Sequence, residues 1–130
     1  AKSLVEDYRA KGIPTVLMTA TCDIIAEPVA GWFGFDTMEA TRLALENGRY
    51  TGKIIPQYCY GPHKVDYARR ICRDRNLDLR AAAYYGDSLA DIPLLEAVGF
   101  PVAVNPAGEL EALAIARGWP IRRWHVKRAE

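Results

Sequence analysis

The chain has little of what marks membrane, secreted and nucleic-acid-binding proteins. Its 130 residues contain no apolar run long enough to cross a bilayer and no signal-peptide pattern, which argues against a membrane protein. The formal net charge is only +1, too small for a broad electrostatic attraction to nucleic acid. The three cysteines are odd in number and share no metal-type Cys-x-x-Cys spacing. These absences predict a reduced, cytoplasmic protein that binds neither membranes nor nucleic acid.

Apolar residues, which make up 50% of the chain, are arranged in alternating helical and strand patterns. A helical stripe at Leu4, Val5 and Tyr8 is followed by a compact apolar strand, Ile13 to Met18, that stops at Thr19. A second helix is expected to start at about residue 21. This alternation is typical of a parallel sheet with helices on its faces, and the length suits one domain.

The pattern changes in the middle of the chain, where a hairpin is predicted. Two strand-like segments, Ala40 to Leu45 and Arg49 to Ile54, are joined by Glu46-Asn47-Gly48. Asn-Gly readily supplies the positive φ angles that a tight turn requires. After the hairpin, Gly61-Pro62 opens a further helix that carries Lys64 near its start.

The most distinctive segment is Gly86-Asp87-Ser88-Leu89-Ala90-Asp91, which follows an apolar run. Ala81 to Tyr85 is predicted to be a buried strand, so Asp87 emerges at its carboxyl end, where open α/β sheets bind ligands. Asp87 and Asp91 would converge on one point, and Mg²⁺ would offset the repulsion between their carboxylates. Asp91 has a second interpretation, because Pro93 suits the first turn of a helix whose N-cap Asp91 would then be.

Two further residues fit a phosphate site. Thr19 ends the first apolar strand, and in a parallel sheet that end lies at the same edge as Asp87. The Thr19 hydroxyl and the amides of Ala20 and Thr21, at a helix start, would hold a phosphate, although an ordinary cap explains Thr19 as well. Lys64 stands at the positive end of its helix, a place that a nearby anion would make favourable for a cation. The alternative for Lys64 is a solvated surface position.

The joint order of these motifs resembles the haloacid dehalogenase superfamily of phosphohydrolases, in the branch that looks like phosphoserine phosphatase. The resemblance covers nearly the whole chain. It is carried by Val16-Leu17-Met18-Thr19-Ala20-Thr21, by the hairpin over 40–52, by Gly61-Pro62-His63-Lys64, by the segment 86–95 and by Val102-Ala103-Val104-Asn105-Pro106.

The resemblance implies an α/β fold, with residues 1–130 forming one partial core domain: a Rossmann-like three-layer parallel sheet with a β-hairpin excursion. It implies that Thr19 and Lys64 are catalytic residues and that Mg²⁺ is held by Asp87, with Asp91 supporting the metal directly or through water. The groups that the resemblance assigns to a small phosphorylated substrate are Thr19, Ala20, Lys64 and Asn105.

One feature of the family is absent from these residues: the first motif, Asp-x-Asp-x-Thr/Val, whose leading aspartate is the nucleophile and whose second is general acid and base. The resemblance therefore implies the carboxyl-terminal part of a longer phosphatase, inactive by itself. A missing amino-terminal segment or a second chain would supply the central first strand of the sheet. The completed protein would hydrolyse small phosphomonoesters through an aspartyl-phosphate, with Mg²⁺ as cofactor.

Two alternatives belong to other classes. The first is a non-catalytic phosphate-binding or scaffold module that kept the fold without a nucleophile, and the sequence permits it. The second is a phospho-acceptor receiver domain, which also places acids, a threonine and a lysine at strand ends. Receivers have paired acids at the first strand and the lysine late, whereas Lys64 precedes Asp87 here. That order argues against a receiver.

Overall fold

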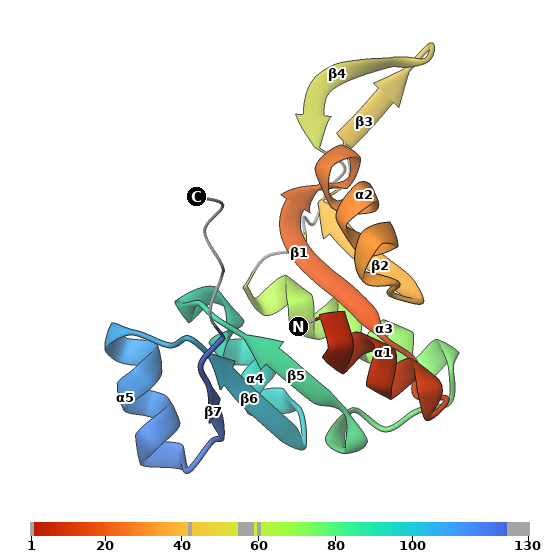
Figure 1. The fold of residues 1–130 in the computed structure, drawn as a ribbon. Coiled ribbons are helices and arrows are strands. Elements are labelled where there is room, and N and C mark those ends of the chain that lie inside the picture. Colours follow the sequence, from red (N-terminus) through yellow and green to blue (C-terminus); the bar gives the residue numbers. More distant parts are fainter. Residues whose placement is uncertain (1, 42, 55–58, 60, 125–130) are drawn as a thin grey trace, which may run out of the picture. The chain divides into compact units, whose positions relative to one another are not determined.

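Helices and strands alternate along most of the chain, as Figure 1 shows. The structure is a computed structural model that describes residues 2–41, 43–54, 59 and 61–124. It divides into two units, residues 1–63 and 64–130, and each is described by itself. A single domain over the whole chain therefore stays a prediction. None of the described helices is long and apolar enough to cross a membrane.

The elements of the first unit are α1 (Lys2–Ala10), β1 (Val16–Cys22), α2 (Asp23–Phe33), β2 (Thr37–Thr41), β3 (Leu43–Glu46) and β4 (Arg49–Ile54). β1 and β2 pair in parallel, and α2, which connects them, packs against both strands. Buried small residues of α2, Ala26 and Ala30, allow this close packing. Gly34 ends α2 in the left-handed conformation, with φ +79°, as glycine does most readily.

The prediction that the first strand stops at Thr19 is wrong. β1 continues to Cys22, whose partner in β2 is Thr41, and α2 begins only at Asp23. Between Met18 and Cys22 the register shifts, so this part of the strand bulges. Continued pairing with β2 keeps the chain extended past Thr19, and helix periodicity alone did not reveal that long-range pairing.

The predicted hairpin forms, with its second strand as predicted and a shorter first strand. Ala40 and Thr41 belong to β2 and pair in parallel with β1, so the expectation that they open the hairpin is wrong. The hairpin itself joins β3 to β4, with Glu46 opposite Arg49. Asn47 and Gly48 have φ +52° and +75°, which confirms the Asn-Gly turn.

Asp36 ties the start of β1 to the start of β2. Its Oδ2 accepts hydrogen bonds from the Thr15 amide, at 2.8 Å, and from the Thr15 hydroxyl, at 3.0 Å. The Asp36 amide donates in return to Thr15 Oγ1 at 3.1 Å, and Arg9 Nε lies 3.3 Å from Asp36 Oδ1. The Thr15 amide, the Thr15 hydroxyl and Arg9 together lower the pKa of Asp36.

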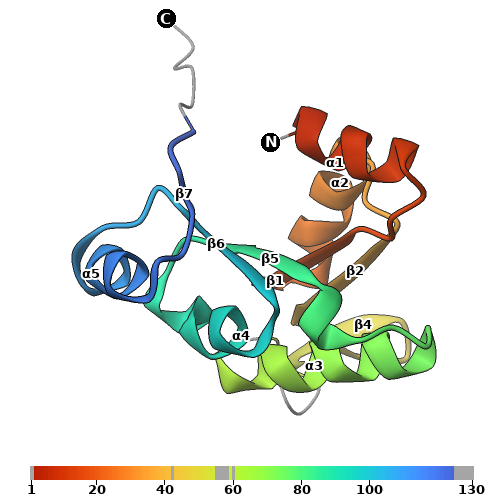
Figure 2. The same ribbon diagram turned by 90° about the horizontal axis from the view of Figure 1, so that it is seen from below.

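The second unit has a parallel sheet in the order β5-β6-β7. Its elements are α3 (Pro62–Asp74), which begins at the boundary of the units, a 3₁₀ turn (Leu79–Ala81), β5 (Ala83–Gly86), a second 3₁₀ turn (Leu89–Asp91), α4 (Ile92–Ala97), β6 (Phe100–Val104), α5 (Gly108–Arg117) and β7 (Ile121–Arg122). Figure 2 shows β5 and β6 side by side. β5 starts two residues later than predicted.

The core of the second unit lies between the sheet and its helices. α4 packs on β5 and β6, and α5 packs on β6. The buried apolar side chains include Leu94, Leu95, Val98, Val102, Val104 and Leu110. A Cβ at Gly99 would lie 1.6 Å from the carbonyl oxygen of Arg80, so only glycine permits this approach of the chain before β6. This packing fixes β5, whose carboxyl end carries Asp87.

β1 and β5 each have one edge without a strand partner. Among the described residues, β1 pairs with β2 alone and β5 pairs with β6 alone. Unpaired backbone groups along a buried parallel strand are costly, about 1–3 kcal/mol each. The α/β class with parallel sheets is confirmed, and a strand from elsewhere that fills these edges stays a prediction.

Replacing Asp36 by asparagine should alter the acid sensitivity of the first unit. A carboxyl whose pKa is lowered by folding stabilises the fold above its unfolded pKa, and this contribution is lost as pH falls through the folded value. We therefore expect the melting temperature of the wild type to fall more steeply than that of Asp36→Asn below about pH 4. Thermal unfolding followed by circular dichroism between neutral pH and this range measures the effect. Asp74→Asn, at an exposed site on α3, is the control. If the melting temperatures of Asp36→Asn and the wild type depend on pH in the same way, the lowered pKa of Asp36 is contradicted.

Candidate active site

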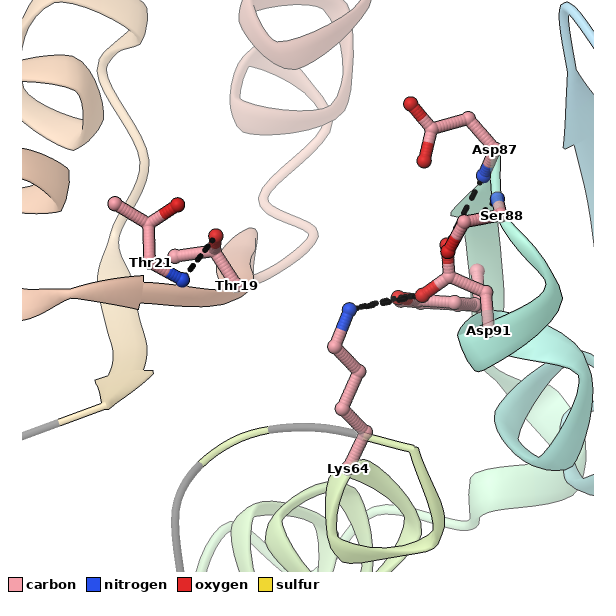
Figure 3. Close-up of polar contacts among 7 residues, drawn as sticks. Thr19, Thr21, Lys64, Asp87, Ser88 and Asp91 are labelled. Carbon is pink, nitrogen blue, oxygen red and sulfur yellow. Dashed lines mark hydrogen bonds and ion pairs between the residues drawn. The ribbon is translucent and has the colours of Figure 1, made fainter.

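Lys64 and Asp91 form a buried ion pair in the second unit. Lys64 comes from the first turn of α3, and its Nζ donates to Asp91 Oδ1 at 2.8 Å (Figure 3). The two residues are only 7% and 3% exposed. Removing one partner of such a pair leaves an uncompensated buried charge, at a cost of about 3–5 kcal/mol. The alternative of a solvated surface position for Lys64 is therefore wrong.

Four further groups, from three residues, donate hydrogen bonds to the Asp91 carboxylate. The Tyr84 hydroxyl donates to Oδ1 at 2.6 Å. Oδ2 accepts from the Asp87 amide at 3.0 Å and from the amide and hydroxyl of Ser88, both at 3.2 Å. Burial alone would raise the pKa of Asp91, but the hydrogen bonds from Lys64 and Tyr84 outweigh it and lower the pKa. Asp91 is therefore held as a carboxylate.

Gly86 allows Asp91 to approach the end of β5. A Cβ at Gly86 would lie 2.7 Å from the Cβ of Asp91, closer than side chains tolerate. Gly86 is the last residue of β5, one residue beyond the predicted strand. The close approach places the Asp87 and Ser88 amides against the Asp91 carboxylate.

Asp91 also occupies the N-cap position of α4, with Pro93 in the first turn, as one interpretation of the sequence proposed. Its side chain makes no capping hydrogen bond to α4 and instead binds backward, to Ser88 and the Asp87 amide. The N-cap position of Asp91 is therefore confirmed, but the interpretation that its side chain caps α4 is wrong. Direct or water-mediated support of a metal by Asp91 stays a prediction.

The Asp87 carboxylate differs from that of Asp91. Asp87 is exposed, at the carboxyl end of β5, and no hydrogen bond or ion pair engages its side-chain oxygens within the part of the chain that the structure describes. In Figure 3 its carboxylate points away from Asp91. Exposed carboxylate oxygens are the ligands that Mg²⁺ takes, so Asp87 fits the expected metal. The described residues contain no cluster of three or more side chains able to hold a metal, so further ligands are required.

Thr19 and Ala20 lie in the bulge of β1 in the first unit. Thr19 is half-buried, and its Oγ1 accepts a hydrogen bond from the Thr21 amide at 3.1 Å. Ala20 and Thr21 are exposed within the strand, so the expectation that their amides begin a helix is wrong. The Thr21 amide already donates its proton to Thr19 Oγ1, whereas the Thr19 hydroxyl keeps its own proton to donate. Phosphate binding by Thr19 and Ala20 stays a prediction.

Asn105 follows β6 and has an evident structural role. Its side-chain nitrogen donates to the Trp124 carbonyl at 2.9 Å, and its Oδ1 accepts from the Trp124 amide at 2.8 Å. The side chain thus continues the pairing of β6 with β7 beyond the last strand residues. Its φ of +43° is one that asparagine adopts more readily than most residues. A phosphate contact by Asn105 stays a prediction.

Tyr84 and Ser88 are the site residues that the sequence analysis missed. Tyr84 stands inside an apolar run, a pattern that predicts a buried strand. A signal was nevertheless present, because a buried tyrosine hydroxyl usually requires a polar partner, and the segment beside it carries two aspartates. Ser88 lies between these aspartates, where a hydroxyl can bind a neighbouring carboxylate.

Comparison with known proteins gives the family of the chain. The family model described as haloacid dehalogenase-like hydrolase matches residues 1–96. The chain therefore belongs to this family. A protein from Streptomyces azureus described as "inhibition of morphological differentiation protein" is 37% identical over 96% of this chain and 45% of its own length. A probable phosphatase from Mycobacterium tuberculosis is 36% identical over 93% of the chain and 42% of its own length.

Solved structures support the same fold. A protein of unknown function from Bordetella pertussis superposes with a TM-score of 0.87 at 35% identity, over 93% of this chain and 56% of that one. A substrate-bound phosphoserine phosphatase superposes with a TM-score of 0.73 at 20% identity, over 86% of this chain and 53% of that one. The resemblance to the haloacid dehalogenase superfamily is thus confirmed by the family match, and the phosphoserine phosphatase shares the fold. The chain spans less than half the length of the two curated relatives above.

Proposed function

We propose that the chain forms part of a magnesium-dependent hydrolase of small phosphomonoesters. The observation that carries the proposal is the buried Lys64–Asp91 pair beside the exposed carboxylate of Asp87. This arrangement supplies a fixed positive charge and a metal ligand from neighbouring elements of one unit. Membership of a hydrolase family and the similarity to a probable phosphatase support the reaction class.

In this proposal the residues of the chain supply binding and charge compensation. The Lys64 ammonium neutralises charge on the phosphate and on the attacking carboxylate, and Asp91 holds that ammonium in place. The Thr19 hydroxyl donates to a phosphate oxygen. Asp87 would hold Mg²⁺, which, when bound, draws electron density from the phosphoryl oxygens.

The nucleophile comes from outside these residues. The sequence contains no Asp-x-Asp pair, and within it the exposed Asp87 is assigned to the metal. We therefore propose that an Asp-x-Asp strand, from another segment or a second polypeptide, lies along the open edges of β1 and β5. An oxygen of its leading aspartate attacks phosphorus, the alcohol leaves with a proton, and water then hydrolyses the aspartyl-phosphate. Below, residues 1–130 together with such a polypeptide are called the completed enzyme.

Residues 1–130 alone should not hydrolyse phosphomonoesters. The polypeptide with the Asp-x-Asp strand should raise both the melting temperature and the magnesium-dependent hydrolysis of an aryl phosphate, because one element closes the sheet and carries the nucleophile. A matched polypeptide with its leading aspartate replaced by asparagine should restore stability without activity. Turnover by the chain alone that survives repurification would sink the proposal. Stability restored without activity by either polypeptide would favour the non-catalytic module.

Asp87→Asn should weaken the magnesium dependence of the completed enzyme, because an amide is a poorer ligand than a carboxylate. The Mg²⁺ concentration for half-maximal activity should rise by at least the roughly 10–100-fold that follows loss of a group supporting a metal. Asp74→Asn, at an exposed site on α3, is the matched control and should leave it unchanged. The measurement is a magnesium titration of initial rates, and indistinguishable titrations for the two variants would refute the metal assignment.

A further inference from the structure

We propose that Tyr84 is a positioning residue that fixes the ammonium of Lys64 by sharing its carboxylate partner. This inference rests on the proposed function for its catalytic consequence, but the geometry stands by itself. Tyr84 comes from β5 and Lys64 from α3, so the contact ties two elements of the second unit together at the candidate active site.

The three side chains form a closed triangle of hydrogen bonds. Asp91 Oδ1 accepts from Lys64 Nζ at 2.8 Å and from the Tyr84 hydroxyl at 2.6 Å. Lys64 Nζ also donates to the Tyr84 oxygen at 3.2 Å. The donors and acceptors are consistent, because the tyrosine hydroxyl gives its proton to Asp91 and accepts one from Lys64. Tyr84 is thus both a partner of the carboxylate and the second acceptor of the ammonium.

This arrangement leaves one proton of the ammonium for a ligand. A lysine ammonium has three N–H groups, and in the described residues two of them have the acceptors Asp91 Oδ1 and Tyr84 Oη. With a single acceptor, the ammonium could pivot about that bond. The two acceptors together set the direction of the third N–H. Fixing that direction before substrate binds is the preorganisation that stabilises developing charge most effectively.

The proposal assigns this role to the hydroxyl, and the Tyr84 ring, whose centroid lies 5.9 Å from Lys64 Nζ, is kept in the test variant. The Lys64 side chain is a flexible four-carbon stem that loses rotamer freedom when its ammonium is fixed, so the loss of one acceptor should loosen the ammonium. Tyr84→Phe removes the acceptor and keeps the ring in β5. The matched control is Tyr85→Phe, which removes the hydroxyl of the next residue in the same strand, where the ring stacks on Trp124 with centroids 6.1 Å apart.

The direct test is the NMR signal of the Lys64 ammonium in ¹⁵N-labelled completed enzyme. The signal is assigned by its loss in Lys64→Met. An ammonium held by two acceptors exchanges its protons slowly, so we expect a sharp signal in the wild type and in Tyr85→Phe. In Tyr84→Phe the signal should broaden or vanish. An unchanged signal in Tyr84→Phe would overturn the proposal.

A stability cycle gives a second measurement that needs no activity. Tyr84→Phe should lower the melting temperature in the wild-type and in the Lys64→Met background, because its hydroxyl also binds Asp91, but the size of the effect should differ once Lys64 is absent. Tyr85→Phe should have the same effect in both backgrounds. If the effects of Tyr84→Phe and Lys64→Met simply add, the two side chains are not coupled and the proposal fails.

The catalytic consequence is a fall in kcat with little change in KM. We expect roughly a 10-fold lower kcat for Tyr84→Phe, less than the 10²–10³-fold loss on removing a charge-stabilising donor itself. Tyr85→Phe should resemble the wild type. An inactive wild type would refute the proposed function, while the NMR signal would still decide whether Tyr84 positions Lys64. An active wild type with unchanged kcat in Tyr84→Phe would overturn the catalytic consequence alone.

Discussion

The site depends on one buried ion pair, between Lys64 of α3 and Asp91 before α4. Two charges removed from water persist only where further hydrogen bonds satisfy them. The Asp91 carboxylate accepts from five donors, which are Lys64 Nζ, the Tyr84 hydroxyl, the Asp87 amide, and the amide and hydroxyl of Ser88. This requirement explains why glycine precedes Asp87, since a side chain at Gly86 would collide with Asp91. It also explains why the two aspartates differ. Protein donors occupy the carboxylate of Asp91, whereas the carboxylate of Asp87 is left for a ligand.

The outline of this site could be predicted from the sequence because its signals are local. Asp87 at a strand end and the Asn47-Gly48 turn follow from residues adjacent in the chain, and the structure bears out both placements. The helix start at Lys64 and the family resemblance both indicate that residue, but its partner, Asp91, lies 27 residues away and could not be read from helix periodicity. The extension of β1 past Thr19 escaped prediction for the same reason, because it depends on pairing with Thr41. The roles of Tyr84 and Asn105 likewise depend on contacts that local patterns do not encode.

The two units contribute different parts to the proposed reaction. The second unit holds the cation and the candidate metal ligand in a rigid set of hydrogen bonds around Asp91. The first unit offers the Thr19 hydroxyl from a bulged strand, a place where sheets commonly redirect side chains toward ligands. Filling the open edges of β1 and β5 would affect both stability and activity, since the strand that we propose to pair with them also carries the attacking aspartate.

The central claim is that Lys64 is a phosphate-binding cation held by Asp91, and calorimetric titration of inorganic phosphate tests it most directly. The completed enzyme, with Mg²⁺, is compared with a Lys64→Met/Asp91→Asn variant, which removes both charges together and leaves no unpaired buried carboxylate. Lys11→Met, at an exposed site, is the control. A hydrogen bond to a charged group contributes about 1.5–3 kcal/mol, so phosphate should bind at least about 10-fold more weakly to the double variant and unchanged to the control. Equal phosphate affinity in all three proteins would contradict the account.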